Sequence, residues 1–117
     1  MKVLQIRTNG DIEEIEIDNN LDSMQAAVGG MIEFIPMTKE VHAYIDEEGK
    51  LKGKELNAWA TLACCHFNVG LAPGDKIVGD MILLGSLNAD GQSDGDSHDI
   101  PDDWECFILP RQIHPIN

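Results

Sequence analysis

Three lysines stand close together in a chain that is otherwise strongly acidic. Lys50, Lys52 and Lys54 fall within five positions, although the chain has only 8 basic residues against 21 acidic ones. Gly53 lies between two of them and would let the backbone turn and approach a ligand closely. Asn57 is positioned to cap a following helix, whose free N–H groups and dipole attract anions. The pattern predicts a binding site for a small anion such as a phosphate.

The same lysines also have a purely structural interpretation. Lys50 and Lys52 are expected to share one face of a short strand over residues 50–52, with Leu51 pointing to the core. Lysines on such a strand would protect a sheet edge against aggregation and would offset the charges of Glu47 and Glu48. Both interpretations stay open from the sequence.

Cys64-Cys65-His66 is a second stretch whose residue types could bind a metal or react as a thiol. Neighbouring residues of a helix point about 100° apart, so these three side chains cannot converge on one ion. The same spacing keeps a thiol from a hydrogen bond with the imidazole. We therefore expect Cys64 and Cys65 to face the core and His66 to be partly buried and hydrogen-bonded.

The acidic stretch of residues 86–99 is the third candidate. Clustered carboxylates suit calcium, but here no glycine at the sixth position is paired with a glutamate at the twelfth, as an EF-hand would require. We expect a flexible, solvated loop and no metal site. The crowded side chains are Asp90, Asp94, Asp96, His98 and Asp99.

Catalysis has little support in the sequence. No nucleophile elbow, zinc-protease helix, phosphate-binding loop or dinucleotide fingerprint is present. Nothing pairs any of the four histidines with a nucleophile. We expect no catalytic residues, no cofactor and no enzymatic activity.

Composition narrows the class of protein. The 117 residues suit a single domain over 1–117, and 43% hydrophobic residues suit a folded chain. The net charge of −13 argues against direct binding of nucleic acid or an anionic membrane, while leaving a basic protein partner open. Three cysteines form no disulfide framework, and no apolar run is long enough to span a membrane. We expect a cytoplasmic protein.

The first half of the chain reads as a hairpin, a helix and a strand. Residues 2–17 alternate apolar and polar side chains around Asn9-Gly10, the strongest short hairpin signal. A short helix follows from Leu21, with Asp18, Asn19 or Asn20 as its cap and Gly29-Gly30 as its stop. Residues 31–37 are apolar and β-prone, with Pro36 at an end or on a sheet edge.

The second half predicts further strands and a second main helix. Strands are expected over 41–45, 50–52 and 76–85, with the acidic loop over 86–99 and a tail over 100–117 that holds a short C-terminal helix. The second main helix begins after Asn57, and we expect its buried face to consist of Trp59, Leu62, Ala63, His66 and Phe67. This order predicts an α+β fold with a mostly antiparallel sheet of about five to six strands, two main helices and the short terminal one.

The chain resembles a known family. The runs "VGGMIEFIPM", "IDEEGKLKGKELNAWATLA" and "GDKIVGDMILLG" are similar to the domain-of-unknown-function family 3846, over about residues 1–87. The most specific block is Glu48 to Thr61, with Gly49, Leu51, Gly53, Asn57, Ala60 and Thr61 as the family pattern would have them. The resemblance implies a small accessory protein of phage or mobile-element type, with no established catalytic residues to carry over.

For a phage accessory protein, the resemblance implies action against host defence in a bacterial cytoplasm. One hypothesis is a sponge that sequesters an anionic, nucleotide-derived immune signal, with oligomerisation through exposed hairpin edges left open. Its ligand-binding residues would be Lys50, Lys52, Gly53, Lys54, Asn57 and Thr61, with Tyr44 or Trp59 stacking on a base. The alternative is an acidic mimic of nucleic acid that inhibits a basic host DNA-binding or defence protein.

Overall fold

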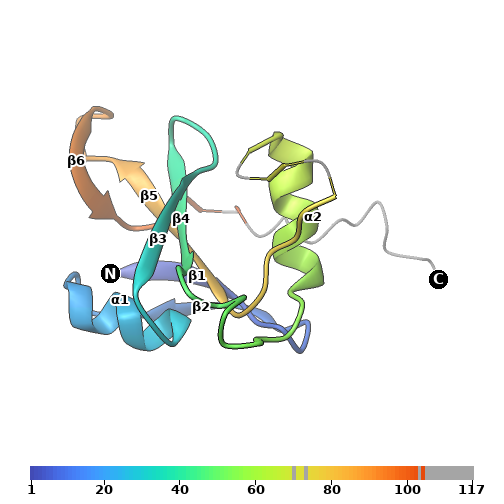
Figure 1. Cartoon of the computed structure of the whole chain (residues 1–117). Helices are drawn as coiled ribbons and strands as arrows, with labels where there is room; N and C mark the ends of the chain where they lie inside the picture. Colours follow the sequence, from blue (N-terminus) through green and yellow to red (C-terminus); the bar gives the residue numbers. More distant parts are fainter. Residues whose placement is uncertain (70, 73, 103, 105–117) are drawn as a thin grey trace.

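The computed structural model describes residues 1–69, 71–72, 74–102 and 104. Figure 1 shows two helices on either side of a curved sheet. The helices are α1 (Leu21–Val28) and α2 (Ala58–Phe67), and the strands are β1 (Lys2–Ile6), β2 (Ile12–Glu16), β3 (Ile32–Pro36), β4 (Val41–Asp46), β5 (Met81–Leu87) and β6 (Ser93–His98). The predicted α+β class is confirmed.

The strands form one antiparallel sheet in the order β2-β1-β5-β4-β3, and β6 pairs with β5 beside this path. β2 and β3 are therefore the strands at the two ends of this path, each with one free edge. Pro36 lies on the β3 edge, as predicted, where its missing N–H costs no bond within the sheet. β5 is central and its first five residues are buried.

The opening hairpin confirms the prediction from Asn9-Gly10. Arg7 N–H donates to the Asp11 carbonyl at 2.8 Å, and Gly10 N–H donates to the Arg7 carbonyl at 3.0 Å. Gly10 takes a φ of +95°, which favours glycine. Asn9 keeps a negative φ, because this loop leaves the left-handed position to Gly10.

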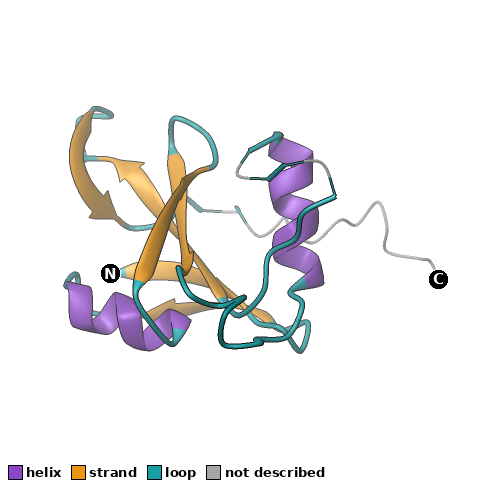
Figure 2. Cartoon of the chain, viewed as in Figure 1, coloured by secondary structure: helices purple, strands orange, loops and turns teal. Residues whose placement is uncertain are grey.

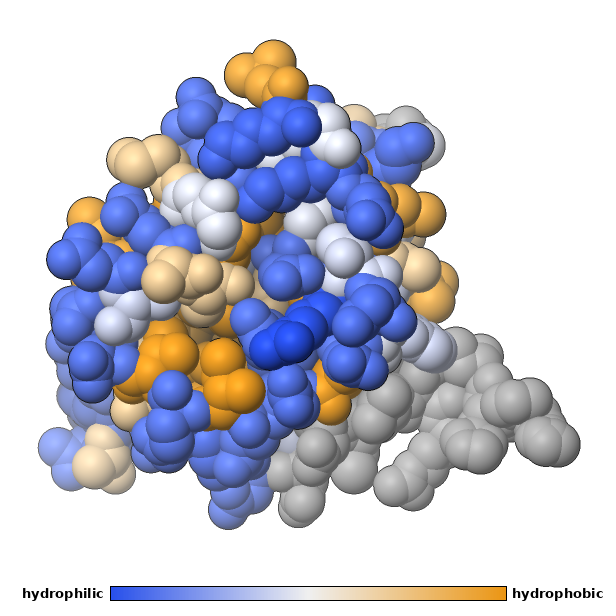
Figure 3. Space-filling model, turned by 90° about the horizontal axis from the view of Figure 1, so that it is seen from below, coloured by the Kyte–Doolittle hydropathy of each residue, from blue (hydrophilic) through white to orange (hydrophobic). Residues whose placement is uncertain are grey.

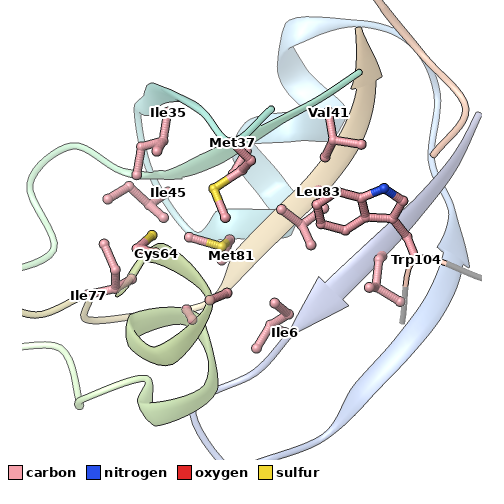
Figure 4. Close-up of a cluster of buried hydrophobic side chains, with 14 of the residues drawn as sticks. Ile6, Ile35, Met37, Val41, Ile45, Cys64, Ile77, Met81, Leu83 and Trp104 are labelled. Carbon is pink, nitrogen blue, oxygen red and sulfur yellow. The ribbon is translucent and has the colours of Figure 1, made fainter. Parts of the chain in front are cut away.

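Strand alternation divides the core into two clusters, one under each helix (Figure 2). Leu4 and Ile6 point to the α2 side, while Val3 between them points to the α1 side. Figure 4 shows Cys64 of α2 lying with sheet residues such as Met81 and Leu83 in the larger cluster. Full burial of a leucine or methionine side chain such as Leu83 or Met81 stabilises the fold by about 1.5–3 kcal/mol.

The predicted caps of both helices are confirmed. Asn20 accepts a hydrogen bond from Ser23 N–H at 2.8 Å, and α1 ends at Gly29 with a φ of +80°. Asn57 accepts one from Ala60 N–H at 3.0 Å, and α2 ends at Asn68 in the left-handed conformation.

The predicted buried face of α2 is confirmed for Trp59, Ala63 and Phe67, which belong to the core cluster or pack against it, and is wrong for Leu62 and His66. Its buried residues are Ala60, Ala63 and Cys64, whereas Leu62 is 50% exposed and His66 is exposed. Ala60 and Cys64 take the inner positions that were expected for Leu62 and His66. The two cysteines consequently separate, with Cys64 buried and Cys65 exposed.

Two predicted boundaries near the end of the chain are corrected. The strand expected over 76–85 is β5 (Met81–Leu87), while Val78 only forms an isolated bridge with Leu56. The loop expected over 86–99 contains β6, because the C-terminal half of β5 offers backbone groups that β6 pairs with. The predicted C-terminal helix falls mostly outside the described residues.

Candidate functional site

The lysine segment is a series of turns, so the predicted strand over 50–52 is wrong. The carbonyl of Asp46 accepts from Gly49 N–H at 3.1 Å, that of Glu48 from Lys52 N–H at 3.0 Å, and that of Lys50 from Gly53 N–H at 3.1 Å. These local bonds use backbone groups that a strand would need. Leu51, expected in the core, is 87% exposed at the tip of this segment.

The lysines surround a buried carboxylate at the end of β4. The side chain of Asp46 is fully buried, and its Oδ2 lies 2.8 Å from Lys52 Nζ and 2.7 Å from Lys54 Nζ. Its Oδ1 accepts a hydrogen bond from Glu48 N–H at 2.9 Å. Burial alone would raise the pKa of Asp46, but the bonds from Lys52, Lys54 and Glu48 lower it to about 2. Asp46 is therefore a charged group that both lysines neutralise.

Lys54 also caps the C-terminal end of α1. Its Nζ donates to the carbonyls of Val28 at 2.9 Å and Gly29 at 3.1 Å. These carbonyls are at the negative end of the helix, where a cation is favoured. Lys54 thus joins three segments of the fold: α1, the end of β4 and the turns after it.

Lys50 occupies a different place from the other two lysines. Its Nζ forms an ion pair with Asp75, and the side chains of both residues remain substantially exposed. The bond from Lys50 holds the pKa of Asp75 below its usual range. Lys50 therefore lies apart from the cluster that Lys52 and Lys54 form around Asp46.

Asn57 and Thr61 use their polar atoms within the fold. Asn57 is fully buried, and its Nδ2 donates to the carbonyls of Ile6 and Gly79, both at 2.9 Å. The Thr61 hydroxyl donates to the Asn57 carbonyl at 2.8 Å and accepts from Ile77 N–H at 2.9 Å. Both side chains anchor the start of α2 to the strands beneath it.

The two aromatic residues proposed to stack on a base lie apart. Trp59 packs against the cluster under α2, whereas Tyr44 packs against the cluster under α1. The ring of Tyr44 contacts the rings of His42 and Phe34, with centroids 5.2 and 5.9 Å away. The sheet separates the two sides, so Tyr44 and Trp59 do not share one site.

Two hollows border the lysine segment. One has a volume of about 390 Å³ and includes Gly53, Lys54, Glu55 and Asp80 in its lining. The other, of about 140 Å³, has a floor that includes Ile35 and Ile77. Its charged lining consists of Glu33, Asp46, Glu47, Lys50, Asp75 and Lys76. Carboxylates thus accompany the lysines in both hollows.

Comparison with known protein families gives a match. The family model described as Domain of unknown function (DUF3846) matches residues 1–105. The chain belongs to this family. The match continues past residue 87, where the expected resemblance ended, and so includes β6. No curated protein and no solved structure matches the chain.

In this DUF3846 chain, the sequence did not reveal a buried histidine between two serines. His42 Nδ1 lies 2.6 Å from Ser86 Oγ, and His42 Nε2 lies 3.0 Å from Ser97 Oγ. Burial, with a smaller contribution from His98, lowers the pKa of His42. A neutral imidazole can donate to one hydroxyl and accept from the other, which joins β6 to β4 and β5. No local sequence pattern indicates this contact, because it depends on strand order.

The acidic residues of the DUF3846 chain gather on a surface formed by β2, β6 and the segments beside them. Asn19 Nδ2 donates to the Ser97 carbonyl at 3.1 Å, so the two acidic segments adjoin. The face seen from below in Figure 3 mixes hydrophilic side chains with apolar ones. We define the acidic face by its exposed carboxylates near this junction, which are Glu14, Glu16, Asp18, Asp94, Asp96 and Asp99.

Internal ion pairs use most of the positive charge in the described part of the chain. Five of the seven lysines and arginines there pair with carboxylates, namely Lys2, Arg7, Lys50, Lys52 and Lys54. Among those residues, no three His, Cys, Asp or Glu side chains are arranged to hold a metal ion. No helix found there is long and apolar enough to cross a membrane.

Proposed function

We propose that this protein is a non-catalytic binding module that recognises a basic protein through the acidic face. One observation carries the proposal: most of the positive charge in the described residues is paired with carboxylates of the same chain, while exposed carboxylates of β2 and β6 lie on adjoining segments. An excess of unpaired negative charge steers basic partners and repels acidic ones.

The partner class follows from the same charge. A protein surface that binds phosphates of nucleic acid presents lysines and arginines, and a patch of carboxylates can occupy it in place of DNA. In a bacterial cell, a DNA-binding or defence protein of the host is the partner that we propose for a phage-type chain. Such binding blocks the partner without any chemical step.

The test measures binding to purified bacterial DNA-binding proteins as a function of salt. We expect affinity to fall at least tenfold between about 0.05 and 0.3 M salt, because screening weakens exposed charge pairs. Bound DNA should be displaced as the protein is added. Affinity that does not change with salt would contradict the proposal.

A charge-matched pair of variants locates the surface. We expect neutralising Glu14, Glu16, Asp94 and Asp96 to weaken binding at least tenfold. Neutralising the same number of exposed carboxylates elsewhere, at Glu40, Glu47, Glu48 and Glu55, should weaken it much less. Equal losses in both variants would mean that net charge alone, rather than the acidic face, determines binding.

A second candidate function is sequestration of an anionic, nucleotide-derived signal. It is supported by the hollow that Gly53 and Lys54 line, which has a volume of about 390 Å³. Glu55 and Asp80 in the same lining oppose an anion, and for this reason we rank it second.

Thermal-shift measurements test the second candidate. A sponge should be stabilised by micromolar concentrations of a cyclic dinucleotide, a cyclic trinucleotide or an ADP-ribose derivative, and should release it chemically intact. Glu55→Gln is the suitable variant, since Glu55 lines this hollow and its removal should tighten the binding of an anion, and Glu40→Gln is its control. The absence of stabilisation across the panel would exclude these ligands.

A further inference from the structure

The outer edge of β2 is free to pair with another strand. Ile17 N–H donates to the Met1 carbonyl at 3.0 Å, and Arg7 N–H donates to the Asp11 carbonyl at 2.8 Å. These bonds show that the odd-numbered residues of β2 turn their backbone groups toward β1. Hydrogen bonding alternates along an antiparallel pair, so Ile12, Glu14 and Glu16 direct their N–H and C=O groups outward. Within the described residues, β1 is the only strand that pairs with β2.

Negative charge protects this edge against pairing with another acidic strand. The β2 sequence IEEIE has no lysine, proline or bulge, which are the other devices that commonly block an edge. Its charges are all negative, with Glu13, Glu14 and Glu16 exposed. Like charges on facing strands destabilise their pairing, so a second β2 is a poor partner, whereas a basic strand is complementary.

The two faces of β2 are complementary to different side chains of an added strand. Ile15 and Ile17 lie on the α1 side, beside a hollow of about 510 Å³ that Ala26 and Ala27 help to line. Glu14 points to the opposite side, because successive side chains of a strand alternate, whereas Glu16 at the end of the strand also lines the hollow. A guest that alternates aliphatic and basic residues satisfies both faces.

Some of the charges at this edge already have partners. Glu13 Oε1 lies 3.3 Å from Arg7 Nη2, and Glu16 Oε2 lies 3.1 Å from the terminal amine of Met1. The Glu14 carboxylate has no ion pair with any described residue, and it lies at the middle of the outward-facing set. Glu14 is therefore the position where a guest lysine or arginine gains the most.

We propose that the free edge of β2 binds an extended segment of a protein partner in which lysine or arginine alternates with aliphatic residues. The segment becomes a further strand of the sheet, with backbone bonds to Ile12, Glu14 and Glu16. This inference rests on the proposed function and specifies how the basic partner is recognised.

The experiment uses two synthetic peptides with blocked ends and identical composition. In one, lysine and valine alternate, and in the other the lysines precede the valines. We expect the alternating peptide to bind at least tenfold more tightly and to slow amide exchange at Ile12, Glu14 and Glu16 at least tenfold. Exchange at the β3 edge residue Phe34 should be unchanged.

Two substitutions at one position separate strand pairing from charge attraction. Glu14→Pro removes an outward N–H without breaking a bond to β1, and proline is tolerated on such an edge. We expect it to weaken the alternating peptide at least tenfold. Glu14→Gln keeps the N–H and should weaken it only two- to threefold. Amide protection in β1 checks that both variants stay folded.

The possible results distinguish a failure of strand pairing from a failure of the proposed function. Equal, salt-dependent binding of both peptides without amide protection would overturn strand pairing and leave the acidic face as a charge-based site. If neither peptide binds, strand pairing is also overturned. The proposed function is then tested only by the binding measurements with bacterial DNA-binding proteins. Protection of the same amides in a dimer without peptide would make a second copy the occupant and overturn the inference.

Discussion

Replacing Asn57 by alanine is expected to lower the free energy of unfolding by about 3–5 kcal/mol. The fully buried side chain satisfies three backbone groups, namely the carbonyls of Ile6 and Gly79 and the N–H of Ala60. Alanine would leave all three without a partner. Each buried polar group left unsatisfied costs about 1–3 kcal/mol. Urea denaturation followed by circular dichroism measures the difference.

Asn20→Ala is the matched control. Asn20 also caps a helix, but its bond to Ser23 N–H is exposed, so water can replace the lost acceptor. We expect a loss of about 1 kcal/mol for this ordinary cap. Similar losses for the two variants would show that Asn57 acts as a cap only. A larger loss for Asn57→Ala identifies it as the residue that joins α2 to β1 and to the segment before β5.

Replacing Lys52 and Lys54 together by methionine is expected to destabilise the fold by about 3–5 kcal/mol. The change leaves the buried Asp46 carboxylate without a cation and removes the lysine from the end of α1. Adding Asp46→Asn to this variant should restore part of the loss, because it removes the uncompensated charge. Lys50→Met should cost less than about 1 kcal/mol, since its ion pair is exposed.

The pH dependence provides an independent measurement of the same cluster. The pKa of Asp46 is about 2 in the folded protein, below the usual value of about 3.9 for an unfolded chain. Its ion pairs therefore contribute about 2 kcal/mol above pH 4, and this contribution is lost as the pH falls toward 2. In the double methionine variant the buried carboxylate favours protonation instead. The stability difference between the two proteins should shrink as the pH falls from 7 to 3, and a constant difference would contradict this assignment.

This cluster changes how lysine substitutions must be interpreted. Alanine at Lys52 or Lys54 would disturb Asp46, and alanine at Lys54 would also expose the end of α1. A loss of ligand binding in such variants would be confounded by a loss of folding. Lys50, whose pair with Asp75 is exposed, is the lysine of this segment that can be replaced with the least effect on the fold.

Local sequence patterns predicted the opening turn, the helix caps and the hairpin strands, because these depend on interactions between neighbouring residues. Asn9-Gly10 marked the opening turn, Asn20 and Asn57 marked the helix starts, and the alternation in residues 2–17 marked the hairpin. Each of these signals acts over a few neighbouring residues. The family resemblance, with its specific block around Glu48 to Thr61, likewise followed from the sequence and is confirmed by the family match.

The candidate site was predicted only in part, because the role of a charged side chain depends on what the fold brings near it. The lysine cluster was noticed from its charge, but its partners are Asp46, the end of α1 and Asp75. The carbonyl of Val28 lies 26 residues before Lys54 in the chain. Sequence spacing cannot indicate such a contact, so the partners that the fold supplies to these lysines were not predicted.

The tertiary structure alone decided the rest. β6 forms because part of β5 is left free by β1, and His42 meets Ser97 across 55 positions because β6 then lies beside β5. The inner face of α2 follows from which small residues fit against the sheet, rather than from hydrophobicity alone. The sequence by itself determined the local elements, their caps and the excess of negative charge. The pairing of distant segments determined which charges neutralise each other inside the fold and which are left at the surface to attract a partner.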